Sequence, residues 1–218
     1  YFIRFAGALT LTHNATSLIL PSSANITTAD GDTATLQYLG SGNWKCLHYQ
    51  KVSGAAVATL TRADLPDGCI INRTYAEYTS NSAITTIIPY DDTIPTNTEG
   101  VEVVTASLTP TSTTNRIRIT FTAFGAASGS GIELVAAMYI DAAASAVRAT
   151  VVASGTVNYP DSISMTYEYV PGDVSSHTYK IRVGPGSAGT VRLNGTSAAR
   201  VLGGAAAATL IVEEIKAS

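Results

Sequence analysis

Charged side chains are scarce in this chain of 218 residues, because Asp, Glu, Lys and Arg together supply only 13% of the sequence. An ordinary soluble domain carries about 25%. Thr, Ser, Gly and Ala are abundant in their place. Since uncharged surface is best tolerated where neighbouring subunits bury it, we expect an obligate oligomer. The alternative is a monomer whose surface is covered by serine and threonine hydroxyls.

The sequence also lacks the features of nucleic-acid-binding and membrane proteins. Its net charge is −3 and its Lys and Arg residues are scattered singly, whereas nucleic acid requires a basic stripe. No apolar run reaches the roughly 18 residues of a membrane-spanning helix. No basic segment leads into an apolar core with a cleavage site, so no signal peptide is expected. We therefore expect neither a nucleic-acid partner nor membrane insertion, and we interpret the sequence as the C-terminal piece of a longer protein.

Residues that carry metal or nucleophilic chemistry are few. Two cysteines, Cys46 and Cys69, do not make a disulfide framework, so we expect two free thiols. The three histidines are far apart and show no metal-ligand spacing. The sequence contains none of the common metalloprotease, phosphate-loop or nucleophile-elbow motifs. We therefore predict no catalytic residue, no metal and no cofactor.

One short stretch, GSGNWKCLHYQ at 40–50, nevertheless places a thiol close to an imidazole. Alternate side chains of a strand share a face, so Trp44, Cys46 and His48 are predicted to lie on one side. A reactive cysteine needs a nearby positive charge or helix N-terminus, together with a group that orients the base, and neither is identifiable here. The pattern therefore favours a face that packs in a core or against another subunit.

Helix signals are almost absent, since no sustained apolar stripe with capping residues occurs. The Ala-rich segment 136–150 is compatible with a helix or with two strands joined by a turn at DAAAS, and we predict the hairpin because its surroundings are strand-like. Short β-branched and aromatic runs divided by Gly, Pro, Asn, Asp and Ser indicate an all-β protein. The predicted strands lie near 8–13, 16–20, 33–39, 43–50, 70–79, 84–89, 101–109, 115–124, 131–141, 146–153, 162–170, 177–184, 189–194 and 207–215.

The predicted strands form two groups. Residues 1–60 are predicted to be a small N-terminal β module, whose few short strands bury little volume and gain stability by intertwining in a trimer. Residues 61–69 belong to a connector rich in small side chains and are predicted to be a linker. Residues 70–218 carry denser strands at a spacing typical of a jelly-roll-like antiparallel β-sandwich, which we term the knob.

Two parts of the sequence resemble proteins of tailed bacteriophages. The segment HNATSLILPSSANITTADGDTATLQYLGSGNWKCLHYQ (13–50) resembles a module of tail fibres that precedes a distal tip. The segments TYAEYTSNSAITTIIPYDDTIPTNTEGVEV (74–104), HTYKIRVGPGSAGTVRLNG (177–195) and GGAAAATLIVEEIKA (203–217) resemble C-terminal domains of tail-fibre-like proteins. The resemblance implies a homotrimeric fibre tip, with a module of the shaft or neck followed by a knob that recognises the host surface. It identifies no ligand and no catalytic residue.

The candidate receptor-binding residues lie in loops of the knob. If both ends of the knob face the shaft, strand parity sends the loops at 110–114, 142–145, 171–176 and 195–206 to the free end. Their polar side chains suit hydrogen bonds to sugar hydroxyls, although aromatic rings on which a sugar could stack are scarce there. The predicted receptor-binding residues are Asn115, Asp141, Asp173, Ser175, Ser176, His177 and Arg200.

An alternative site is a lateral cleft between subunits. By the same parity Tyr90 and Tyr159 fall at the opposite end, with Asp91 and Asp92 beside Tyr90. A glycosidase needs two carboxylates flanking the scissile bond at ~5–9.5 Å, and adjacent residues of a strand point in opposite directions. We therefore expect Asp91 and Asp92 to cap backbone N–H groups of their loop.

Two further acidic pairs have structural interpretations. Asp30 and Asp32 in ADGDT lack the remaining ligands of a Ca²⁺ loop, so a solvated turn is predicted. Glu213 and Glu214 lie in the last predicted strand, where one must point outward and the other inward. An arginine of the strand near 115–124, Arg116 or Arg118, is a plausible partner across the sheet.

Taken with the resemblance, these features predict a non-enzymatic tail-fibre tip of a virion that is made in the cytoplasm of its bacterial host. Its expected partners are identical subunits, a bacterial surface glycan or outer-membrane protein, and other virion tail proteins through a region that precedes this sequence. Two alternatives stay open. One is a tailspike-type polysaccharide hydrolase, and the other is a purely structural fibre or collar domain.

Overall fold

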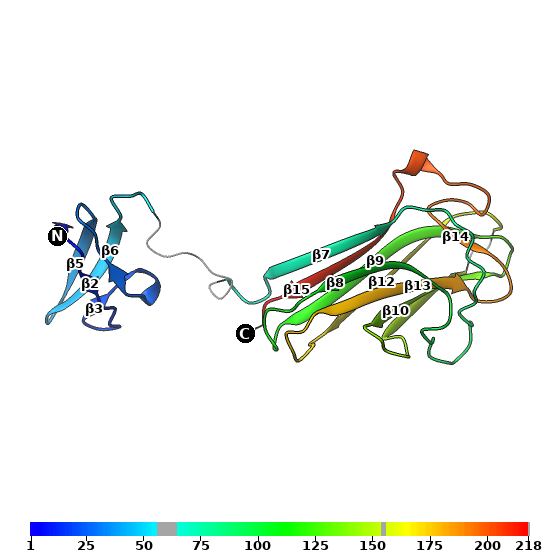
Figure 1. Ribbon diagram of the computed structural model, residues 1–218, viewed down its shortest axis with the longest axis horizontal. Coiled ribbons are helices and arrows are strands. Elements are labelled where there is room, and N and C mark those ends of the chain that lie inside the picture. The colour runs from blue at the N-terminus through cyan, green and yellow to red at the C-terminus, as the bar shows by residue number, and fades with distance from the viewer. Residues whose placement is uncertain (56–64, 154–155, 218) are drawn as a thin grey trace. The chain divides into compact units, whose positions relative to one another are not determined.

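The computed structural model describes residues 1–55, 65–153 and 156–217, and it divides the chain into two compact units, Tyr1–Leu65 and Pro66–Ser218 (Figure 1). Within the described residues the only helical elements are two single turns, η1 (Pro21–Ser23) and η3 (Leu202–Gly204). The prediction of an all-β protein is therefore confirmed. Among these residues, no helix is both long and apolar enough to cross a bilayer.

Unit 1 (Tyr1–Leu65) is a small β module. Its strands are β1 (Phe2–Arg4), β2 (Thr10–Leu11), β3 (Leu18–Ile19), β4 (Ile26–Thr27), β5 (Thr33–Gly40) and β6 (Asn43–Gln50). One sheet has the order β1-β5-β6-β3, in which β3 runs parallel to β6, and β2 pairs separately with β4. The buried core consists of Phe5, Leu20, Ile26, Ala34, Cys46 and Tyr49. With so small a core, the unit depends strongly on its buried polar contacts.

The first two predicted strands of unit 1, near 8–13 and 16–20, are shortened to the two-residue β2 and β3. The reason is a local turn between them. The side-chain oxygen of Asn14 accepts hydrogen bonds from the backbone N–H groups of Thr16 and Ser17, both at 2.9 Å. Because these N–H groups donate to Asn14, they are not available for the interstrand hydrogen bonds of longer strands.

Unit 2 (Pro66–Ser218) is a two-sheet sandwich of jelly-roll topology (Figure 1). Its strands are β7 (Ile70–Tyr78), β8 (Val101–Leu108), β9 (Arg116–Ala127), β10 (Glu133–Ile140), β11 (Arg148–Ala153), β12 (Asp161–Tyr169), β13 (His177–Pro185), β14 (Val191–Leu193) and β15 (Ala208–Ile215). One sheet has the order β11-β10-β13-β8 and the other β12-β9-β15-β7, with β14 on the end of β9. Apart from the β10–β11 hairpin, each connection among the eight long strands passes from one sheet to the other, which is the jelly-roll arrangement. The predicted knob fold is confirmed.

The sandwich forms because its strands alternate apolar and polar side chains. In β9, Ile117, Ile119 and Phe121 are fully buried, whereas Arg116 is exposed and Arg118 partly so. The inward side chains of both sheets meet in one large core. The Ala-rich segment 136–150 forms the predicted hairpin of β10 and β11, which turns at a left-handed Asp141 (φ 55°).

The predicted strand near 84–89 is wrong. Ile84 makes only an isolated bridge to Val191, and the chain then crosses the outer face of the β10 sheet. There Ile88 is fully buried with side chains of β10 in a second apolar cluster, Val135, Ala137 and Tyr139. The segment approaches β13 so closely that a Cβ at Gly184 would collide with the carbonyl oxygen of Thr86. The apolar residues of 84–89 therefore cover a sheet instead of extending one.

Candidate functional site

The register of the strands places the predicted binding loops at one end of unit 2, but it is not the predicted end. Ile70 pairs with Ile215, so the chain enters and leaves unit 2 at the same end. Tyr169 pairs with Ile117 and Ile117 with Glu214, which sets the loops at 109–115 and 170–176 at this end as well. Pairing of Ile140 with Tyr179 adds the turn at 141–147. The missing strand at 84–89 reverses the parity of the first three loops. The loop at 195–206 stays at the free end, because the three-residue β14 pairs with the far end of β9 and does not cross the sandwich.

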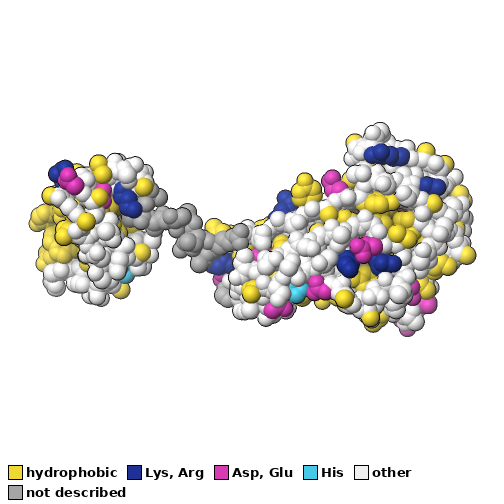
Figure 2. All heavy atoms as spheres, in the orientation of Figure 1, with side chains coloured by type: hydrophobic (Ala, Val, Ile, Leu, Met, Phe, Trp, Pro, Cys, Tyr) yellow, Lys and Arg dark blue, Asp and Glu magenta, His cyan; other side chains and the backbone are white. Residues whose placement is uncertain are grey.

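Three predicted residues, Asp141, Asp173 and His177, come together at this end. Nδ1 of His177 lies 2.8 Å from Oδ2 of Asp141, and Nε2 lies 3.2 Å from Oδ1 of Asp173. Ser175 donates its backbone N–H to Asp173 at 2.7 Å, and Ser176 follows in the same loop. Figure 2 shows a histidine beside acidic side chains at this end of unit 2. The imidazole thus links the β10–β11 turn to the loop that precedes β13.

The two remaining predicted residues are held elsewhere. Asn115 is buried, donates to Oε1 of Glu214 at 2.7 Å and accepts the backbone N–H of Ala217 at 3.0 Å. Its role is therefore to anchor the last strand. Arg200 lies in the loop at the opposite end, where it donates to the carbonyl of Gly204 at 3.0 Å. Neither side chain belongs to the His177 cluster.

The carboxylates around His177 favour its charged form. The hydrogen bond to Asp141 is the largest contribution and raises the pKa of His177, against a smaller opposing effect of partial burial. The backbone N–H of Ser175 lowers the pKa of Asp173. Partial burial of Asp141 opposes ionisation, but hydrogen bonds from His177 and from the backbone N–H of Thr178 outweigh it and lower the pKa of Asp141. The cluster therefore favours the imidazolium form of His177, which lies between two carboxylates.

We expect the loops that His177 links to loosen as the pH rises. Because the folded state raises the pKa of His177, its contribution to stability is fully present below about pH 6.5 and is lost above the elevated pKa. An NMR titration of the ring protons should give a midpoint above ~6.5. Amide exchange of Ser175 and Thr178, corrected for intrinsic rates, should accelerate across that midpoint in the wild type but not in His177→Gln. A midpoint below that of free histidine would refute the assignment.

The residues of the proposed lateral cleft lie in separate loops. Tyr90 and Tyr159 are 65% and 68% exposed. Tyr90 donates its backbone N–H to the carbonyl of Gly186 at 3.1 Å, which ties its loop to the end of β13. Asp91 accepts the backbone N–H of Thr93 at 2.8 Å, so the predicted capping role is confirmed for this carboxylate. Asp92 lies beside it in the same loop.

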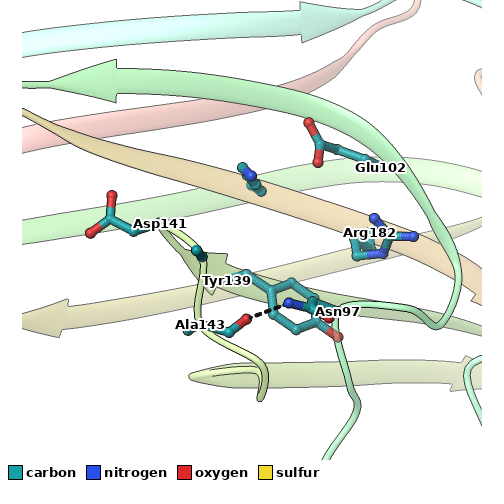
Figure 3. A pocket seen from close by; sticks show the side chains of 8 residues that line it. Asn97, Glu102, Tyr139, Asp141, Ala143 and Arg182 are labelled. Carbon is teal, nitrogen blue, oxygen red and sulfur yellow. Dashed lines mark hydrogen bonds between the residues drawn. The ribbon is translucent and has the colours of Figure 1, made fainter.

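Sequence reasoning missed a polar pocket of about 290 Å³ on the outer face of the β8-β13-β10 side of the sandwich (Figure 3). Figure 2 shows acidic and basic side chains gathered over this part of unit 2, on a surface that otherwise carries few charges. The covering segment supplies Asn97, which donates to the carbonyl of Ala143 at 3.1 Å and so closes one side. The lining residues are Asn97, Glu102, Tyr139, Asp141, Ala142, Ala143, Lys180 and Arg182.

The walls of this pocket are fixed by hydrogen bonds to the covering segment. The Tyr139 hydroxyl donates to the carbonyl of Thr96 at 2.7 Å, and burial raises the pKa of Tyr139 to about 12. Arg182 donates through Nε to the carbonyl of Glu99 at 2.6 Å and through Nη2 to that of Gly100 at 2.8 Å. These contacts make the pocket a rigid feature of the fold. Lys180 and Arg182, two residues apart in the predicted strand near 177–184, were its only signal in the sequence.

The acidic pairs of the sequence have structural roles. Asp32 is 1% exposed rather than solvated, which corrects the predicted open turn. Of the pair in β15, Glu213 points outward and receives both Nε and Nη2 of Arg118, at 3.2 and 2.9 Å, as predicted. Glu214 points inward and is fully buried, which confirms the predicted alternation.

The thiol in unit 1 is not part of a reactive pair. A β-bulge at Leu47 shifts the pairing of β6, so that Cys46 and Tyr49 are buried while His48 is exposed. The predicted shared face of Trp44, Cys46 and His48 is therefore wrong for His48. Burial raises the pKa of Cys46, whose Sγ lies 3.3 Å from the carbonyl oxygen of His48. Such a thiol is a core residue.

Comparison with known proteins adds little to this picture. No protein-family model matches the sequence, and a search of curated proteins finds no match. Among solved structures, the chain is similar to that of infectious bursal disease virus strain Gx, at 14% identity and a TM-score of 0.34, over 89% of this chain and 50% of that one. The chain is also similar to the VP2 subviral particle of infectious bursal disease virus, at 13% identity and a TM-score of 0.35, over 88% of this chain and 50% of that one.

A bacteriophage protein is also similar, namely the enzymatically active domain of tailspike protein 4 of bacteriophage CBA120. It matches at 12% identity and a TM-score of 0.23, over 58% of this chain and 19% of that one. The chain thus spans half or less of the length of these three structures. At such values the likeness assigns neither a function nor a site residue.

Proposed function

We propose that this chain is a receptor-binding module of a virus particle, comparable to the tip of a bacteriophage tail fibre. In this proposal it attaches to a glycan or protein of a bacterial surface and does not cleave it. The observation that carries the proposal is the pocket of Asn97, Glu102, Lys180 and Arg182, because it offers hydrogen-bond donors and acceptors of both charges in a rigid concave surface. Saccharides, with closely spaced hydroxyls, suit such a lining.

The pocket favours binding over hydrolysis. Two carboxyl residues, Glu102 and Asp141, line it. The Asp141 carboxylate, however, already forms hydrogen bonds with His177 and with the backbone N–H of Thr178, both at 2.8 Å. It lies on the opposite side of the pocket from Glu102 (Figure 3). A glycosidase needs one carboxylate free to act as base or nucleophile and a second with a raised pKa as acid, but the pKa of Asp141 is lowered. This arrangement gives the hydrolase alternative no support.

Exposed apolar side chains support the proposed homotrimer. Unit 1 buries only six core residues and leaves about as many large apolar side chains in solvent. Such exposure is unusual on a small free-standing module and is typical of surfaces that another chain covers. A trimer would also multiply weak individual sites into useful avidity. The exposed side chains include Tyr1, Phe2, Leu9, Tyr38, Leu39 and Leu47.

The proposal is tested by adsorption of the fluorescently labelled chain to a panel of bacterial cells. We expect saturable binding to at least one strain, competition by polysaccharide purified from that strain, and a light-scattering mass three times that of one chain. A stable monomer would refute the trimer. A trimer that binds no cell surface would favour the purely structural alternative.

A further inference from the structure

Two cationic side chains in the pocket lack an acidic partner. Within the described residues, neither Lys180 nor Arg182 has a carboxylate oxygen within 4.0 Å of its side-chain nitrogens, although the chain carries a net charge of −3. Both project from the same face of β13, two residues apart, so their Cα atoms are about 6.8 Å apart. The pair places two positive charges side by side on one wall of the pocket.

Arg182 is held in place without being neutralised. Its Nε and Nη2 groups donate to the carbonyls of Glu99 and Gly100, at 2.6 and 2.8 Å. Carbonyl oxygens fix the orientation of the guanidinium but leave its positive charge uncompensated, and Nη1 makes no contact of this kind in the described structure. A fixed, charged donor at the wall of a pocket is preorganised to bind an anion.

Glu102 gives the same pocket an acceptor. It lies opposite Arg182 in the β8–β13 register, yet no carboxylate–guanidinium contact within 4.0 Å joins them in the described structure. Figure 3 shows the two side chains on the same side of the pocket with their charged ends apart. A ligand that places an anionic group on the cations and hydroxyls on Glu102 and Asn97 would satisfy all of these groups.

We infer that this pocket binds a sugar unit that bears an anionic group, a carboxylate or a phosphate. The anionic group faces Lys180 and Arg182, and ring hydroxyls donate to Glu102 and bond with the Asn97 amide. The volume of about 290 Å³ suits a single sugar residue of a longer chain. This inference rests on the proposed function and names the chemistry of the receptor.

The test is an NMR titration of the full chain with three probes: galacturonate, galactose 6-phosphate and galactose. At equal concentrations the acidic sugars should shift the backbone amides of 96–97, 142–144 and 180–182, and galactose should shift them much less. A larger effect of galacturonate would identify the group as a carboxylate, and a larger effect of the phosphate ester would identify it as a phosphate. Equal shifts by all three sugars, or shifts by none, would overturn the inference.

The matched variants are Lys180→Gln and Lys45→Gln. Each removes one positive charge at a similar side-chain length, but Lys45 is an exposed residue of β6 in unit 1. Loss of the charge at Lys180 should weaken binding of the better acidic sugar by about tenfold or more, the size of a charge-assisted contact. The Lys45 variant should bind like the wild type. Unchanged binding by a Lys180→Gln protein with a native circular dichroism spectrum would contradict the assignment.

Adsorption to cells separates this inference from the proposed function. If the wild type binds cells and Lys180→Gln binds them equally, the receptor site lies elsewhere, so the inference fails and the function stands. If the wild type binds no cell surface, the proposed receptor-binding function is refuted, whatever the result of the sugar titration. If Lys180→Gln loses binding to the acidic sugar and to the cells, both the proposed function and the inferred sugar site are supported.

Discussion

Replacing Glu214 with alanine should lower the free energy of unfolding of unit 2 by about 3 kcal/mol, because three donors lose the carboxylate oxygen that they share. Oε1 of Glu214 accepts the backbone N–H of Thr111 at 2.6 Å, the Thr111 hydroxyl at 2.8 Å and the Asn115 amide at 2.7 Å. These contacts fasten the loop at 109–115 to the last strand. In the alanine variant the buried Asn115 amide loses its carboxylate acceptor, and the loop loses its attachment to β15.

The adjacent Glu213 provides the control. It lies on the same strand but faces outward, and its partners Arg118 and Arg73 are 37% and 55% exposed. An ion pair with such exposed partners contributes about 1 kcal/mol or less, so Glu213→Ala should cost clearly less than Glu214→Ala. The stabilities of the two variants are compared by denaturant unfolding followed by circular dichroism. Tryptophan fluorescence is unsuitable here, because the single tryptophan, Trp44, lies in unit 1 and reports on the unfolding of that unit. Equal destabilisation by both variants would show that the Glu214 network is not what holds the loop.

Replacing Asp32 with alanine should leave unit 1 largely unfolded. One oxygen of Asp32 accepts the Tyr49 hydroxyl at 2.6 Å and the backbone N–H of Ala29 at 2.8 Å. The other accepts the backbone N–H of Val52 at 2.9 Å. The carboxylate therefore joins the turn before β5 to the segment after β6, across a core of only six residues.

Trp44 fluorescence measures this effect directly, because its ring packs against Tyr1 and Tyr38 in the folded unit. Asp30→Ala is the matched control. Asp30 lies two residues away, and its ion pair with Arg4 is solvent-exposed on both sides, so its loss should leave the fluorescence transition almost unchanged. A native-like transition for Asp32→Ala would mean that apolar packing alone sustains the module.

Strand periodicity was enough to predict the sandwich. The alternation of Ile117, Ile119 and Phe121 with polar residues depends on local sequence, and eight long strands of this kind have few ways to close into two sheets. The same local signal failed at 84–89, where apolar residues lie over a neighbouring sheet. Periodicity cannot distinguish a strand from a segment that covers one. That single error moved three predicted loops to the wrong end of unit 2.

The site was only partly predictable for a related reason. The sequence identified Asp141, Asp173 and His177 as polar residues at or beside loops, and the fold brings them together. The pocket combines Asn97 and Glu102 with residues of β10 and β13 that lie far along the chain, so its existence depends on sheet order. Likewise Asn115 looked like a surface residue, but the buried Glu214 draws its side chain inward.

The most direct test of the account is to incubate the full chain with purified polysaccharide of a bacterium that it adsorbs to, and to measure both the bound fraction and the polysaccharide chain length. The account predicts saturable binding that weakens in Lys180→Gln, with no new reducing ends. Shortening of the polysaccharide would contradict it and identify a hydrolase, and the absence of any binding would contradict the receptor-binding role.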